Sequence, residues 1–112
     1  MKNISIIAAL VASVFSSAAY AECAGLSLNE ANVCVSIEYK NADDTLNNVY
    51  RTLPKTDLLV SAELSWIDYR DSHCNNVSSP FRGRDDYYYI RTTCLTALTN
   101  QRTNALMNWP IE

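Results

Sequence analysis

The ten residues "SWIDYRDSHC", Ser65 to Cys74, bring together side chains of the kinds that form active sites. They include two aspartates, one arginine, one cysteine and the sole histidine of the chain. Three roles fit these residue types: a cysteine–histidine nucleophile, a metal site, and the structural centre of a small fold. The spacing of the residues decides among these roles, because spacing fixes which side chains can meet.

The spacing disfavours catalysis and metal binding. His73 and Cys74 are adjacent, and adjacent residues on a helix point about 100° apart. A cysteine that is oxidised to a disulfide cannot act as a nucleophile. The chain has no nucleophile-elbow motif, no Cys-x-x-Cys spacing and a single histidine. A carboxylate pair of the glycosidase kind needs a cleft, which a small helical bundle rarely offers. The sequence therefore predicts no enzyme, no metal site and no cofactor.

A structural role fits the stretch better. On a helix, five of its residues fall at i, i+3, i+4, i+7 and i+8 and share one face: Trp66, Tyr69, Arg70, His73 and Cys74. We expect this face to point into a helical bundle, with Trp66 as a core anchor. A partly buried Arg70 would need a carboxylate partner, and Asp43 or Asp44 on the preceding helix is the candidate.

The first 21 residues have the features of a secretory signal peptide. Lys2 supplies a positive start, residues 4–15 form a short apolar run, and Ala19-Tyr20-Ala21 is a small-x-small cleavage pattern. The apolar run is too short for a membrane span. Glu22 before Cys23 makes a poor lipoprotein signal. We therefore predict cleavage after Ala21 and a soluble domain over residues 22–112, periplasmic or secreted, with no membrane insertion.

The predicted mature domain is mildly acidic. The whole chain has 9 basic and 12 acidic residues; residues 1–21 contain one lysine and no acid, which leaves a formal charge of −4. A protein that binds nucleic acid usually presents a basic surface. The charge therefore argues against nucleic acid and suits a basic protein partner.

Glycine and proline divide the mature chain into three helical blocks. The first opens with the capping-box pattern of Ser27 and Glu30 and ends at Pro54. The second starts at Thr56 or Asp57 and ends around 75–76. The third follows a turn-rich loop, has Asp85 and Asp86 near its N-terminus, and ends at 108–110. No segment alternates with a period of two, so the predicted fold is all-α.

Short connections favour an antiparallel three-helix bundle that runs up, down and up. Four cysteines then gather at one pole of the bundle: Cys23, Cys34, Cys74 and Cys94. An even number of cysteines in a small exported domain predicts disulfides, here two. Three pairings are possible. We favour the local pairs, Cys23–Cys34 and Cys74–Cys94, while the crossed pairing of Cys23 with Cys94 and Cys34 with Cys74 is geometrically open.

Taken together, the segments "ADDTLNNVYRTL" (42–53), "LLVSAELSWIDYRDSHC" (58–74) and "CLTALTNQRTNAL" (94–106) resemble the LprI-like lysozyme-inhibitor family of bacterial envelope proteins. One departure is the segment "AELS" before Trp66, where the family often has Gln-Ala or Ala-Gln. The resemblance implies an exported helical protein that binds lysozyme and blocks its muramidase activity. We assign structural roles to six motif residues: Tyr50, Trp66, Arg70, Asp71, Arg102 and Leu106.

An inhibitor would act by occluding the cleft of a lysozyme-type hydrolase. The loop 76–86 is the predicted insertion element, because cysteines constrain both of its flanks and a constrained loop loses less entropy on binding. Arg82 or Arg84 could pair with the catalytic carboxylates of the hydrolase. In the run 87–89 of three tyrosines, at least one ring should be exposed. The candidate partner-binding residues are Ser78, Ser79, Phe81, Arg82, Arg84 and Tyr88.

Two other functions remain open from the sequence. The domain could be a periplasmic immunity protein that neutralises a cognate cell-wall-degrading toxin. It could also be a structural or stress-related envelope protein with no inhibitory role.

Overall fold

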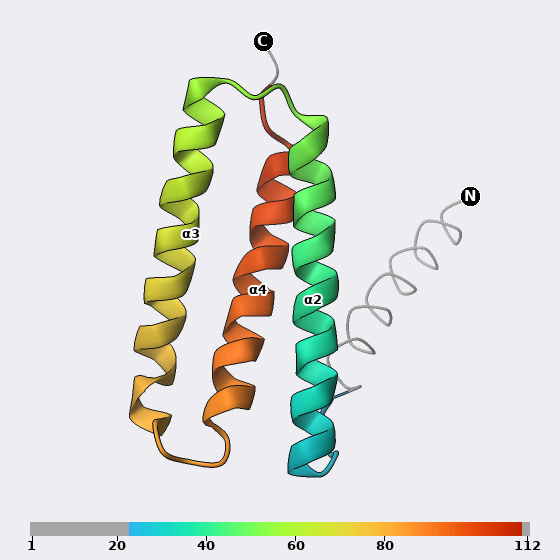
Figure 1. The fold of residues 1–112 in the computed structure, drawn as a ribbon, viewed down its shortest axis with the longest axis vertical. Helices are drawn as coiled ribbons and strands as arrows, with labels where there is room; N and C mark the ends of the chain where they lie inside the picture. The colour runs from blue at the N-terminus through green and yellow to red at the C-terminus, as the bar shows by residue number, and fades with distance from the viewer. Residues whose placement is uncertain (1–22, 111–112) are drawn as a thin grey trace, which may run out of the picture.

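The computed structural model describes residues 23–110, and these residues form a bundle of three long helices (Figure 1). Helix α2 spans Leu28–Thr52, α3 spans Asp57–Ser78 and α4 spans Tyr87–Met107; a short 3-10 helix, η1, covers Ser79–Phe81. None of the described residues is in a strand. The all-α, up–down–up bundle is confirmed. The predicted signal peptide and its cleavage site lie outside the described residues.

Local sequence signals place the first two helix starts correctly. The Ser27 hydroxyl accepts a hydrogen bond from the Glu30 amide at 3.4 Å and donates to the Glu30 carboxylate at 2.8 Å. The Thr56 hydroxyl accepts from the Leu59 amide at 3.1 Å. Each cap satisfies an amide that has no partner within its own helix.

The second connection begins later than predicted, whereas the third helix starts after Asp85 and Asp86 as expected. Helix α3 continues to Ser78, because the hydroxyl of this serine donates to the Cys74 carbonyl at 2.7 Å from inside the last turn. Asp86 occupies the N-cap position of α4, but its side chain makes no capping bond. It accepts instead from the Arg84 guanidinium at 3.0 and 3.1 Å. The aspartate thus ties down the loop before the helix.

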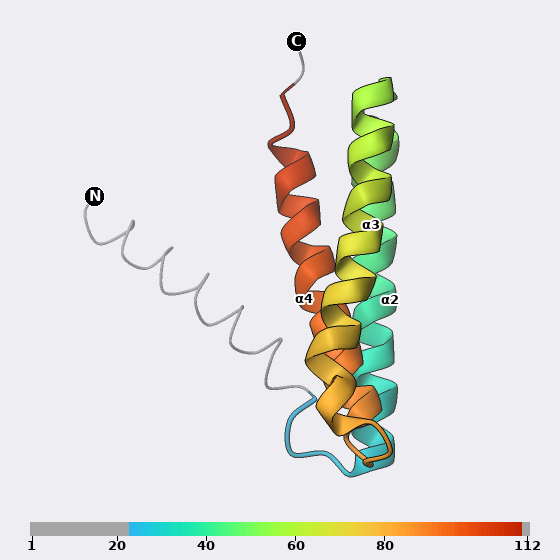
Figure 2. The same ribbon diagram turned by 90° about the vertical axis from the view of Figure 1, so that its left-hand side faces the viewer.

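Helix α4 is the element on which the other two pack. Figure 1 shows α4 between α2 and α3, and the rotated view of Figure 2 shows it displaced to one side of both. Its buried positions are rich in threonine: Thr92, Leu95, Leu98, Thr99, Thr103 and Leu106. Small side chains let helices approach closely. The hydroxyls of Thr96 and Thr103 each donate to the carbonyl four residues earlier, at 3.1 Å, which satisfies them inside the bundle.

The core has two apolar clusters, one toward each end of the bundle. Leu46, Leu59 and Leu106 form the cluster near the α2–α3 connection. Cys74, Leu95 and Leu98 form the other, near the cysteines. The two disulfides are Cys23–Cys34 and Cys74–Cys94, with Cα–Cα distances of 5.5 and 5.6 Å. The favoured local pairing is confirmed, and both bridges lie at the end of the bundle that we call the disulfide pole.

Candidate functional site

The partly buried Trp66 lies close to two arginines. The Arg70 guanidinium carbon is 5.2 Å from the centroid of the indole ring, and that of Arg102 is 5.8 Å away. Arg70 also lies 6.0 Å from the ring of Tyr39 on α2. A guanidinium over an aromatic face is attracted by the ring quadrupole, most strongly where water is excluded. Arg70 thus joins α3 to α2 through Tyr39, and Trp66 joins α3 to α4 through Arg102.

Arg102 also forms a buried ion pair. Its Nε donates to the Glu63 carboxylate at 2.8 Å, and the two side chains are only 12% and 11% exposed. The guanidinium lies 5.7 Å from the Trp109 ring. Its Nη2 atom is buried and has no hydrogen-bond partner among the described residues. Arg102 therefore depends on Glu63 and the indole rings to offset the loss of its hydration.

The sequence analysis missed Glu63, which lies in the "AELS" segment. Its only sequence signal is the four-residue spacing from Leu59, which puts it on the buried stripe of α3. The partner that makes its burial possible is 39 residues away on α4.

The predicted partner of Arg70 was wrong. Arg70 pairs with the adjacent Asp71 at 2.9 Å, and not with Asp43 or Asp44. Asp44 pairs with Lys40 at 2.8 Å, and Asp43 accepts from Asn47 at 3.3 Å. The Arg70 side chain lies along the Trp66 and Tyr39 rings, which leaves its Nε beside its own neighbour in sequence.

Two other members of the opening stretch also differ from expectation. Tyr69 and His73 are exposed, with their rings stacked on each other at 5.5 Å, and do not face the bundle. The buried face of α3 runs through Leu59, Glu63 and Cys74. Each exposed residue precedes a residue of the inward face by one position, which turns it about 100° away.

Burial raises the pKa of the Tyr39 hydroxyl above its usual value. The Arg70 guanidinium opposes this shift in pKa, and the carboxylates of Asp43 and Asp71 add to it. The phenol is therefore neutral at physiological pH, which suits a packing residue and not a general base.

Two other motif residues lie in or against the core. Leu106 is fully buried in the core cluster, and the half-buried Tyr50 packs against that cluster with the Lys55 ammonium 4.5 Å above its ring. The Asp71 side chain, by contrast, is 46% exposed beside Arg70. The structural roles of the six motif residues stay a prediction.

The candidate partner-binding residues lie at the disulfide pole, but in different environments. Ser78 is fully buried and holds the end of α3, so it can influence a partner only by shaping the loop. Ser79 donates to the Asn76 carbonyl at 3.0 Å. Phe81 is half-buried beneath the Arg84 guanidinium, which lies 4.9 Å from its ring. Arg82 is exposed; its backbone amide donates to the Ser79 carbonyl at 3.3 Å, while its guanidinium makes no ion pair with the described residues.

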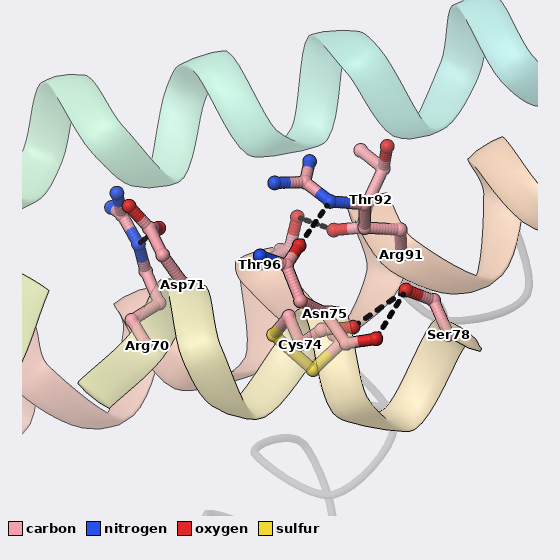
Figure 3. The surroundings of a disulfide bond; sticks show 9 residues. Arg70, Asp71, Cys74, Asn75, Ser78, Arg91, Thr92 and Thr96 are labelled. Atoms are coloured by element: carbon pink, nitrogen blue, oxygen red, sulfur yellow. Dashed lines mark hydrogen bonds and ion pairs between the residues drawn. A yellow bond between two sulfur atoms is a disulfide. The ribbon is translucent and has the colours of Figure 1, made fainter. Parts of the chain in front are cut away.

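The loop is braced at its base by both flanking helices. Figure 3 shows the Cys74–Cys94 bridge between α3 and α4, with Arg91 reaching from α4 to Asn75. The Arg91 Nε donates to the Asn75 side-chain oxygen at 3.1 Å. Gly83 takes a φ of 81°, a left-handed conformation that other residues rarely adopt. The exposed arginines are thus presented from a fixed base.

A further candidate residue, Tyr88, connects the loop to α2. Its ring is exposed, as expected for at least one of the three tyrosines, and its hydroxyl shares a hydrogen bond with Ser36. Tyr88 is the second residue of α4, so this contact joins the start of α4 to α2.

A possible set of metal ligands exists in the described part of the chain, but it does not have the chemistry for one. Cys23, Cys34 and Glu38 place their ligand atoms within 4.8 Å of one another. Both sulfur atoms belong to the same disulfide. Metals in such sites bind thiolates, so this group does not form a typical metal site.

Comparison with known proteins gives the family of the chain. A family model described as "Lysozyme inhibitor LprI" matches residues 18–106. An uncharacterized protein of Rhizobium meliloti (strain 1021) is 29% identical over 100 residues, which cover 72% of this chain and 72% of that protein. No solved structure matches the chain. Within residues 23–110, no helix is both long and apolar enough to cross a membrane. The match over most of the chain, together with the motif residues in their bundle positions, shows that this protein belongs to the LprI lysozyme-inhibitor family.

Proposed function

We propose that the protein is an exported inhibitor of lysozyme-type peptidoglycan hydrolases and acts by covering the cleft of the hydrolase, without chemistry of its own. The observation that carries this proposal is the match of residues 18–106 to the lysozyme-inhibitor family. The excess of acidic over basic residues also suits a basic partner.

The loop at the disulfide pole is the proposed inhibitory element. Its base is held by a disulfide and by the Arg91–Asn75 hydrogen bond, so little loop entropy remains to be lost on binding. Arg82 offers an exposed guanidinium with no ion-pair partner in the described chain. Glycoside hydrolases of this class carry a pair of carboxylates in the cleft. A guanidinium matches a carboxylate in charge and in hydrogen-bond geometry.

The first test is a cell-wall clearing assay. Oxidised protein from Glu22 onward is titrated against a C-type lysozyme in a suspension of bacterial cell walls. We expect clearing to slow in a saturable, stoichiometric manner. Unchanged clearing, with the protein shown helical by circular dichroism, would contradict inhibition of this lysozyme class and favour a cognate toxin or a non-inhibitory envelope role.

The loop makes a separate prediction. Changing Arg82 and Arg84 together to alanine should raise the inhibition constant at least about tenfold, which corresponds to about 1.4 kcal/mol. Arg82→Ala alone should account for most of the effect, because Arg84 is already paired with Asp86. Arg51→Ala removes an exposed arginine at the opposite end of the bundle and is the matched control. A double variant that inhibits as well as the wild type would exclude the loop as the inhibitory element.

Export is part of the proposal and has its own measurement. Expression of the whole chain in a bacterium should give protein in the periplasm or medium whose N-terminal residue is Glu22, as determined by mass spectrometry. Recovery of the intact chain in the cytoplasm would contradict export.

A further inference from the structure

A second apolar surface lies on α2, outside the loop. Val33 and Ile37 are 60% and 55% exposed and are four residues apart, so they form one ridge along the helix. Leu26, also exposed, lies just before the N-cap of α2 and lines one hollow together with Val33 and Ile37. A contiguous exposed apolar patch on a folded protein often marks a surface that binds a partner.

Hollows flank the ridge on both sides. One has a volume of about 590 Å³ and is bounded by Leu26, Val33 and Ile37. The other, of about 400 Å³, lies between the ridge and Tyr88 of α4. A groove on either side leaves room for a partner to contact both aliphatic side chains. The arrangement resembles an amphipathic helix bound in the groove of a receptor.

The ridge is continuous with the loop of the proposed inhibitory element. A third hollow, at the disulfide pole, is lined by Leu28 of α2 together with the loop residues 83–86. Tyr88, hydrogen-bonded to Ser36, forms the wall between this end and the ridge. The chain segments that carry the two surfaces, residues 26–37 and 79–86, both lie toward the lower end of the bundle in Figure 1. One large partner could therefore contact both.

The charges around the ridge indicate which kind of partner would bind there. Among the described residues that line the two flanking hollows, the charged side chains are Glu30 and Glu38, and there is no lysine or arginine. The Glu30 carboxylate is held in place by the Ser27 hydroxyl. An aliphatic centre with carboxylates at its edge complements a basic surface with an apolar depression. A second copy of this chain would place carboxylates against carboxylates.

We infer that the α2 ridge, formed by Leu26, Val33 and Ile37, is a second contact surface for a basic hydrolase and binds beside the cleft that the loop covers. This inference rests on the proposed function, because it names a further surface of the same complex. Val33 and Ile37 fill an apolar depression on the partner, and Glu30 pairs with a lysine or arginine at its rim.

The test compares two matched double variants against a C-type lysozyme. Val33→Ala with Ile37→Ala removes the ridge and keeps a good helix former at both positions. Leu58→Ala with Leu64→Ala makes the same kind of change on α3, where both residues are also exposed. We expect the ridge variant to raise the inhibition constant about ten- to a hundredfold, and the control to change it less than twofold. Glu30→Gln should weaken the salt dependence of binding, because it removes one charge at the rim.

The possible outcomes separate the proposed function from the ridge inference. Wild-type protein that does not inhibit lysozyme contradicts the proposed function itself. Wild-type inhibition that the ridge variant retains in full overturns the ridge inference alone. A wild-type dimer that becomes monomeric in the ridge variant, by light scattering, with inhibition unchanged, would assign the ridge to self-association and also overturn it. Circular dichroism of each variant checks that the helices are intact.

Discussion

Substitution of Arg102 by alanine is expected to lower the free energy of unfolding by about 3–5 kcal/mol, the usual effect of removing one member of a buried ion pair. Without the guanidinium, the Glu63 carboxylate, which is only 11% exposed in the folded protein, loses its ion-pair partner. A domain of this size has a total stability of roughly 5–15 kcal/mol. The variant should therefore be partly unfolded at moderate temperature.

Urea unfolding, followed by circular dichroism, measures this effect. The double change Glu63→Leu with Arg102→Met replaces both charges with apolar side chains and should recover most of the loss, since no charge stays buried without a partner. Arg51→Ala, at an exposed arginine, should change the free energy of unfolding by less than about 0.5 kcal/mol. A loss below about 1 kcal/mol for Arg102→Ala would show that the ion pair is not a main determinant of stability.

Removal of the Cys74–Cys94 bridge by alanine at both positions should cost about 3 kcal/mol. The bridge spans 20 residues in sequence, and closing a loop of this length lowers the entropy of the unfolded chain by that amount. Cys74 is also fully buried in the core cluster, so alanine leaves a small void there. Chemical unfolding of the oxidised wild type and the variant gives the difference in stability.

Hydrogen exchange separates the local effect of this bridge from the global one. Amides of residues 76–86 should exchange faster in the Cys74→Ala, Cys94→Ala variant even under conditions where the rest of the bundle stays folded. Cys23→Ala with Cys34→Ala, which opens the other bridge, is the control and should leave exchange in the loop unchanged. Equal loop protection in all three proteins would mean that the Arg91–Asn75 contact and Ser78 hold the loop without the disulfide.

Much of the fold could be predicted from the sequence because its signals are local. Ser27 and Thr56 cap the amides of residues that follow within three positions. The pairing of Cys23 with Cys34 follows from short separations and an up–down–up path. In each case the interacting residues are close in the chain, so their spacing in the sequence is enough to predict the contact.

The parts that could not be predicted depend on which face of each helix points toward the core. A one-position error moved Tyr69 and His73 from the expected inner face to the surface. On α2, Val35 is buried, whereas Val33 and Ile37, which are equally apolar, are exposed. Tryptophan, arginine and tyrosine occur at both buried and exposed positions. Their places in the sequence therefore do not show which side of a helix faces the core. The burial of Glu63 could not be predicted, because the arginine that pairs with it lies 39 residues away in the chain.

The central position of α4 has a consequence for the order in which the protein folds. The helix that both others pack upon is the last one in the chain. A nascent chain that ends before Leu106 has α2 and α3 but lacks a residue of the core cluster that they share with α4. The domain must therefore wait for nearly its whole length before it can become stable, whereas the Cys23–Cys34 bridge needs only the first turns of α2. Removal of residues 101–112 takes away Leu106 and is therefore expected to prevent stable folding of the bundle.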